Sequence, residues 1–128
     1  MAVDRSHAAV SAARRRLGDD PSVSLYELDV ATAWPDEGTF DLVVVSEVGY
    51  FLSPAGLDGL VERVSTSLAP AGVVALCHWR HPVSGWLLDA DGVHRRFADG
   101  PLPPVQATYH DRDVEIRMHA PHWLDHDR

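Results

Sequence analysis

The chain has 128 residues, enough for one domain built around a single hydrophobic core. Its net charge of −8, from 11 basic and 19 acidic residues, argues against nucleic acid as a partner, because binding to a phosphate backbone requires positive charge. No apolar run approaches the roughly 20 residues that span a bilayer, and the single cysteine, Cys77, excludes an internal disulfide and suits a reducing cytoplasm. Composition therefore predicts a cytoplasmic globular protein with no membrane or nucleic-acid partner.

The first part of the sequence predicts a strand, a helix and a second strand. Residues 1–4 have the pattern of the end of an apolar strand. Ser6 can cap the helix that follows, in which apolar residues repeat at intervals of three and four up to residue 17. Residues 23–28 alternate between apolar and polar side chains, which predicts a strand that ends just before Asp29.

The stretch from Phe40 to Leu52 carries the strongest signal. Leu42 to Val45 form an unbroken, mostly β-branched run, which predicts a strand buried on both faces of a parallel sheet. Ser46-Glu47 follow this strand directly, and the aromatic pair Tyr50-Phe51 comes shortly after. Because ligands of open α/β sheets bind outside the carboxyl ends of the strands, these side chains are candidates for a site.

The remaining elements complete an α/β pattern. Ser53-Pro54 begin a well-capped helix, and residues 73–77 form another apolar strand that leads to His78. A short helix is expected over 89–97, and residues 105–119 predict an antiparallel hairpin. The order of elements predicts a mostly parallel sheet with a C-terminal antiparallel hairpin over residues 1–119, followed by a loose tail over 120–128.

Five segments occur in the same order, and at similar spacing, as in one enzyme family. They are Ala2–Ser6, Leu28–Val30, Phe40–Leu52, Leu68–Val73 and Cys77–Pro82. This combination resembles the class I S-adenosylmethionine-dependent methyltransferases, in particular the nodulation-protein-S-like N-methyltransferases. The resemblance implies a Rossmann-like fold, S-adenosyl-L-methionine as the cofactor, and a small-molecule methyl acceptor, most simply an amine.

The resemblance also implies roles for two acidic positions. In the family, an acidic residue at the end of the second strand accepts hydrogen bonds from both ribose hydroxyls of the cofactor; Asp4, followed by Arg5, matches that place. A carboxylate suits a diol because it offers two acceptor oxygens. Asp29 matches the family residue at the adenine amino group, with Val30 beside the ring.

The segment after the strand at Phe40 matches the loop that lines the rest of the cofactor. The resemblance assigns Ser46, Glu47 and Val48 to the methionine part. It implies that aromatic rings face the methyl donor or the acceptor, where cation–π attraction favours a sulfonium or ammonium group. The rings are those of Tyr50, Phe51 and Trp79.

Two histidines after the strand at 73–77 are candidates for catalysis. His78 or His81 could act as a general base, since imidazole titrates near neutral pH. Methyl transfer to an amine mainly requires positioning and an unprotonated nucleophile, so a role in shaping the acceptor site is the favoured interpretation.

The C-terminal histidines raise the alternative of a metal site. His119, His122 and His126 are closely spaced, as zinc ligands can be. However, Pro121 interrupts the segment and no helix or cysteine supports the geometry, so a solvated tail without metal is the favoured interpretation.

One departure from the family pattern is large. Family members begin with a strand, a glycine-rich loop and a helix, and the loop lets the backbone approach the cofactor. Residues 1–128 contain no such loop, so the sequence predicts a partial fold with the first strand and helix missing, and with unpaired inner sheet edges. The expected chain is a truncated methyltransferase, with activity of the chain alone left open, or a half-enzyme completed by a partner.

Two further functions stay open at this point. A non-catalytic interaction module could pair with a partner, or with itself, through an open sheet edge. A piece of a dinucleotide-binding oxidoreductase fits less well, since its glycine fingerprint is also absent.

Overall fold

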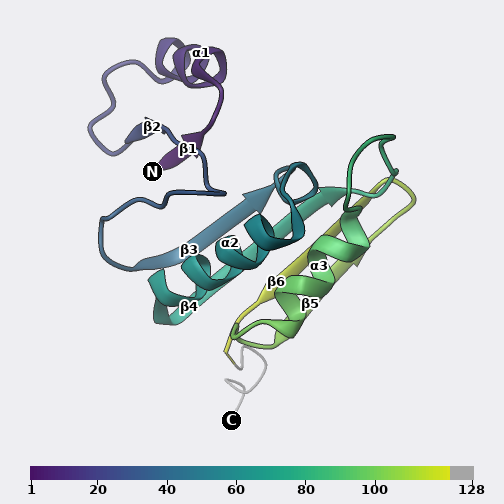
Figure 1. Cartoon of the computed structure of the whole chain (residues 1–128). Coiled ribbons are helices and arrows are strands. Elements are labelled where there is room, and N and C mark those ends of the chain that lie inside the picture. The colour runs from purple at the N-terminus through teal and green to yellow at the C-terminus, as the bar shows by residue number, and fades with distance from the viewer. Residues whose placement is uncertain (122–128) are drawn as a thin grey trace. The chain divides into compact units, whose positions relative to one another are not determined.

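The computed structural model describes residues 1–121, which form two sheets rather than one (Figure 1). Contacts divide the chain into two compact units, Met1–Asp36 and a second that begins at Glu37. The sequence alone predicts one domain and gives no sign of this division. Each unit is therefore described separately.

The first unit is small and has short strands. Strand β1 (Ala2–Asp4) pairs in parallel with β2 (Leu25–Glu27), which is shorter than the predicted 23–28. Helix α1 (His7–Leu17) lies between them in sequence and begins, as predicted, at Ser6, whose Oγ accepts the Ala9 N–H at 3.2 Å. The cap is effective because it satisfies one of the four N–H groups that a helix leaves without a partner at its start.

The second unit contains a mixed four-stranded sheet with the strand order β3-β4-β6-β5. Strands β3 and β4 are parallel, and the C-terminal hairpin of β5 and β6 joins β4 in antiparallel fashion. The bounds are Phe40–Ser46 for β3, Leu68–Trp79 for β4, Val105–His110 for β5 and Val114–His119 for β6. The predicted α/β class and the C-terminal antiparallel hairpin are confirmed.

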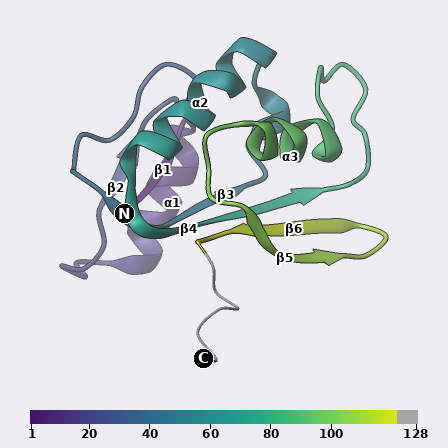
Figure 2. The same cartoon turned by 90° about the horizontal axis from the view of Figure 1, so that it is seen from below.

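Two helices cover one face of this sheet. Helices α2 (Pro54–Ser67) and α3 (Ala90–Asp99) lie side by side on that face in both views (Figures 1 and 2). The predicted cap of α2 is confirmed, since Ser53 Oγ accepts the Gly56 N–H at 3.0 Å. A further short turn, the 3₁₀ helix η1 (Gly49–Phe51), follows β3. The core lies between the two helices and the sheet, and Phe97 of α3 is fully buried there.

The opposite face of the sheet corrects one expectation. Val43 and Val45 are buried, but Leu42 and Val44 are 55% and 61% exposed, so the prediction of a strand buried on both faces is wrong. Successive side chains of a strand point to opposite faces, and no helix of residues 37–121 covers the second face (Figure 2). An apolar run therefore does not by itself prove burial on both sides.

The packed structure includes the first residue of the predicted tail. Ala120 is fully buried and its N–H donates to the Pro104 carbonyl at 3.0 Å, so the loose tail predicted from residue 120 does not begin there. His122 and His126, the other members of the metal alternative, lie outside the described residues. No helix found among residues 1–121 has the length and apolar character needed to cross a bilayer.

Candidate functional site

Two of the predicted cofactor residues come to one edge of the first unit. Strand β1 ends at Asp4, whose register partner on the parallel β2 is Glu27, so Asp29 follows at the same carboxyl edge. Asp4 is exposed, and its Oδ1 accepts the Ser6 N–H at 2.7 Å. Asp29 is half-buried and accepts the Ala31 N–H at 2.9 Å. These bonds hold both carboxylates at the edge where open α/β sheets bind ligands.

Their neighbours differ in exposure. Arg5 is exposed and Val30 is half-buried. Asp4 and Arg5 are thus exposed to solvent, whereas Asp29 and Val30 are partly sheltered from it.

In the second unit, Glu47 organises the end of β3. Its backbone has a φ of +57°, a region that side-chain-bearing residues seldom adopt and that tends to occur at functional sites. Its Oε1 accepts the Trp79 N–H at 2.7 Å, and its Oε2 accepts the Tyr50 hydroxyl. Glu47 therefore ties the end of β3 to the end of β4 and to η1. Ser46 beside it is exposed, and Val48 is half-buried.

The predicted aromatic residues do not form one group. Tyr50 is buried, whereas Phe51 and Trp79 are 58% and 44% exposed. Tyr50 stacks on Trp86, with ring centroids 4.7 Å apart and an interplanar angle of 10°, and Phe51 meets the same indole edge-on at 4.5 Å. The sequence did not predict Trp86 as part of this group, because it lies in a loop with no periodic pattern. The only signal in the sequence was an isolated large ring next to a glycine, Gly85, which has a φ of +89° in the structure.

The two histidines proposed for catalysis have different surroundings. His78 is fully buried, with its Nε2 3.2 Å from the Gly49 backbone N and its Nδ1 2.9 Å from Nε2 of His94. Burial, followed by the neighbouring His94, lowers the pKa of His78 to about 3, so the ring is neutral near pH 7. Both nitrogens are engaged, which favours a structural role over that of a general base. His81 is about half exposed and its Nε2 lies 2.7 Å from Oδ1 of Asp113.

A buried polar group extends from His78 into the core. His94 of α3 has no exposed surface, and its Nδ1 lies 3.6 Å from Oε2 of Glu115, which is also buried. Arg117 donates to the other oxygen of Glu115 at 3.0 Å. The sequence did not reveal His94 or Glu115, because charged and polar residues in amphipathic elements are read as surface. Within residues 1–121 no set of three or more metal-ligating side chains has an arrangement that could hold a metal ion.

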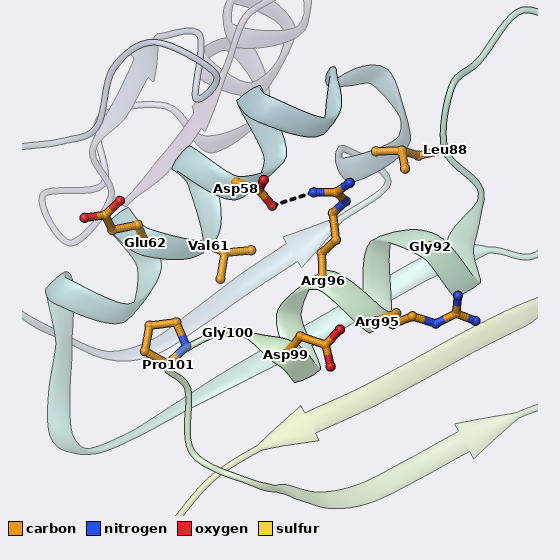
Figure 3. Close-up of a pocket in the computed structure, with 10 residues that line it drawn as sticks. All are labelled: Asp58, Val61, Glu62, Leu88, Gly92, Arg95, Arg96, Asp99, Gly100 and Pro101. Carbon is orange, nitrogen blue, oxygen red and sulfur yellow. Dashed lines mark hydrogen bonds and ion pairs between the residues drawn. The ribbon is translucent and has the colours of Figure 1, made fainter.

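A groove between α2 and α3 is separate from all these residues (Figure 3). It has a volume of about 780 Å³ and carries charges of both signs, with Arg96 paired to Asp58 at 2.7 Å. None of the residues predicted for the site lines it. The predicted site residues thus lie near strand ends and outside this groove.

Comparisons with known proteins agree on one family. A family model described as "Methyltransferase domain" matches residues 1–72. A crystal structure from Pseudomonas syringae, assigned as a methyltransferase, is 32% identical, with 92% of this chain and 70% of that chain covered and a TM-score of 0.74. A search of curated protein sequences returned no match.

Two N-methyltransferase structures share the fold at lower identity. NodS from Bradyrhizobium japonicum WM9, in complex with S-adenosyl-L-homocysteine, is 18% identical with a TM-score of 0.78, and the match covers 93% of this chain and 64% of that one. The glycopeptide N-methyltransferase MtfA, complexed with S-adenosyl-L-methionine, is 19% identical with a TM-score of 0.72 and coverages of 94% and 76%. This chain spans from 64% to 76% of the length of the three solved chains named here.

Proposed function

Because this chain belongs to the class I S-adenosylmethionine-dependent methyltransferase family, we propose that its residues bind S-adenosyl-L-methionine for methyl transfer to a small molecule. The observation that carries the proposal is the alignment of β1 and β2, which brings Asp4 and Asp29 to one carboxyl edge. That edge is where ligands bind in open α/β sheets. The residues present fit the cofactor, because an exposed carboxylate can accept hydrogen bonds from a ribose diol.

Each predicted residue then has a part in holding the cofactor. Asp4 accepts hydrogen bonds from the ribose hydroxyls, and the neighbouring Arg5 belongs to the same binding surface. Asp29 accepts from the adenine amino group, and Val30 packs on the ring. The hydrogen bonds that both aspartates already form to nearby backbone N–H groups support these roles, since they limit the rotation of the carboxylates.

The loop after β3 is proposed to receive the methionine part of the cofactor. Ser46, Glu47 and Val48 line it, and the Glu47 carboxylate acts mainly by bracing the loop against β4. When bound, the cofactor supplies an electrophilic methyl group on a sulfonium.

We propose an amine as the acceptor. NodS and MtfA are both named N-methyltransferases, and exposed aromatic rings attract cationic amines. Phe51 and Trp79 offer such exposed rings, whereas Tyr50 supports them from within the fold. His81, exposed and paired with Asp113, is the accessible candidate for accepting the amine proton.

We further propose that residues 1–128 bind the cofactor only weakly by themselves. No glycine-rich loop follows a strand in this sequence, so the backbone contacts that such a loop gives are missing. A segment or a partner that supplies this loop would raise the affinity. Micromolar binding by the isolated chain, measured by calorimetry, would contradict this part of the proposal.

The test of cofactor binding is an NMR titration with S-adenosyl-L-homocysteine up to millimolar concentration. We expect amide shifts at the ends of β1 and β2, and an affinity reduced on the order of tenfold in Asp4→Asn, since a charge-assisted hydrogen bond contributes about 1.5–3 kcal/mol. Asn keeps an oxygen for the Ser6 N–H, and the cap of α1, which is formed by Ser6 Oγ, is not changed. Asp19→Asn, an exposed aspartate after α1, is the matched control. Absence of any shift in the wild-type chain would overturn the proposal.

A second candidate function is an interaction module, favoured by one observation. In the described part of the chain β3 is an edge strand, and it also exposes Leu42 and Val44. Exposed apolar edge strands tend to pair with other chains. If two copies associate through β3, Val44→Lys should abolish a concentration-dependent dimer in sedimentation experiments. A wild-type chain that stays monomeric at high concentration would remove this candidate.

A further inference from the structure

The proton positions in the buried histidine pair follow from one fixed donor. The backbone N–H of Gly49 can only donate, so Nε2 of His78, 3.2 Å away, is the acceptor and carries no proton. A neutral His78 therefore holds its proton on Nδ1 and donates it to Nε2 of His94 at 2.9 Å. His94 in turn holds its proton on Nδ1, which faces Oε2 of Glu115 at 3.6 Å, too far for a direct hydrogen bond but close enough for attraction.

Both rings are neutral near pH 7. The pKa of His78 is lowered to about 3 by burial and by His94, and the pKa of His94 is lowered to about 4 by burial and then by Arg117. A proton added to either ring would place two donors against each other, at Gly49 or between the rings. The donors therefore all point in one direction, from Gly49 to His78, from His78 to His94, and from His94 toward Glu115.

Helix α3 also packs directly against η1, the turn that begins at Gly49. A Cβ added at Gly49 would lie 2.4 Å from Cγ1 of Val93, so only glycine allows η1 to approach α3 this closely. Val93 and His94 are consecutive, and both are fully buried. The helix thus meets η1 directly through Val93 and indirectly through His94 and His78.

We propose that His94 is a positioning residue for the methyl-transfer site, acting through His78 on the backbone of Gly49. By accepting the Nδ1 proton of His78, it keeps Nε2 free for the Gly49 N–H and so fixes the start of η1. That turn carries Tyr50, which stacks on Trp86, and Phe51, which exposes its ring. The inference rests on the proposed function, because only a site at this strand end gives η1 something to position.

The experiment is histidine and amide NMR on the full apo chain, which needs neither cofactor nor turnover. In the wild-type chain we expect Nε2 of His78 to be unprotonated and the Gly49 amide to be protected from exchange. His94→Phe removes the acceptor at similar volume, so His78 loses its fixed tautomer. We then expect Gly49 exchange to rise on the order of tenfold, the value for one hydrogen bond of about 1.4 kcal/mol.

Two variants separate positioning from a general loss of packing. His94→Gln offers an amide oxygen to the Nδ1 proton of His78, and we expect it to restore protection at Gly49. His119→Gln alters another buried histidine, whose Nδ1 bonds the Pro103 carbonyl instead, and should leave Gly49 unchanged.

Different results would contradict the inference and the proposed function. A protonated Nε2 on His78 in the wild-type chain overturns the inference without any variant, even if His94→Phe does not fold. Unchanged Gly49 exchange in His94→Phe, or equal loss in His119→Gln, overturns it too. If S-adenosyl-L-homocysteine does not bind but the tautomers are as expected, the proposed function is wrong. The hydrogen bonds from Gly49 through His78 to His94 then have a structural role alone.

Discussion

The two units of the chain differ in how much apolar surface each removes from water. Among the described residues, fourteen apolar side chains are buried, and Val10 is the one that lies in residues 1–36. The strands differ in the same sense: β1 and β2 have three residues each, whereas β3 has seven and β4 has twelve. The first unit therefore depends on local hydrogen bonds and the second on a packed core.

The difference extends to the polar groups of the site. The first unit presents Asp4 at an exposed edge, where the carboxylate meets solvent. In the second unit, Glu47 and His78 are already used in bonds to Trp79 and Gly49. The first unit thus offers groups that a ligand can engage directly, while the second holds a strand end and a turn in a fixed arrangement.

The largest effect should come from removing a core ring of the second unit. Phe97→Ala leaves a cavity between α3 and the sheet, and we expect a loss of about 3–5 kcal/mol in the free energy of unfolding, measured by urea denaturation. In the first unit, Val10→Ala removes two carbons and should cost only about 1.5 kcal/mol, from about 0.8 kcal/mol per buried methylene.

Hydrogen exchange shows where each loss falls. Phe97→Ala should lower the protection of amides in β4 and α3, and Val10→Ala that of amides in α1. If Val10→Ala were as costly as Phe97→Ala, the first unit would have a core of its own and the contrast between the units would be wrong.

Local signals in the sequence were sufficient for many elements. Ser6 and Ser53 predicted the starts of α1 and α2, because a capping hydroxyl acts on backbone N–H groups two or three residues away. The hairpin predicted over residues 105–119 is found there, and its turn is held by Asp111, whose Oδ1 accepts the N–H groups of Asp113 and Val114. Such features involve neighbours in the chain and can be read directly.

Features that depend on residues far away in the sequence could not be predicted. The run at Leu42–Val45 looks buried on both faces, yet whether Leu42 and Val44 are covered depends on what lies over the sheet. His94 and Glu115 become buried only because their elements pack together. The resemblance located Asp4, Glu47 and the other candidates by position, but their roles remain predictions that the titration must test.

A second contrast is in the response to acid. The folded-state pKa values of His78 and His94 are about 3 and about 4, against an ordinary 6.5. As the pH falls below 6.5, the unfolded chain takes up these protons and the folded chain does not. Stability of the second unit is therefore full above pH 6.5 and is lost as the pH falls toward 4 and then 3. The slope is about 1.4 kcal/mol per pH unit for each histidine.

Urea denaturation from pH 7 to pH 4.5 measures this slope. The double variant His78→Gln/His94→Gln should be less stable at pH 7 but should show a flatter pH dependence, which separates these two groups from the carboxylates. Residues 1–36 contain one histidine, His7, whose side chain is exposed. The protection of α1 amides should therefore lack the steep pH dependence that the two buried histidines give to the second unit. An unchanged slope in the double variant would mean that the two rings are not held neutral by the fold.

The smallest expected effect gives the most direct comparison, since the two helix caps are alike in chemistry. Ser6→Ala and Ser53→Ala each remove one hydrogen bond to a backbone N–H, of 3.2 and 3.0 Å, and each should cost about 1 kcal/mol. In α2 the buried face retains the helix, so exchange should quicken only in its first turn. In α1 one buried valine gives little such support, so the same loss should raise exchange along the whole helix. Ser84→Ala, in an exposed loop, serves as the control. If amide exchange in Ser6→Ala rose only in the first turn of α1, packing beyond the one buried valine would hold that helix. The first unit would then not depend on local hydrogen bonds, and the contrast with the second unit would be wrong.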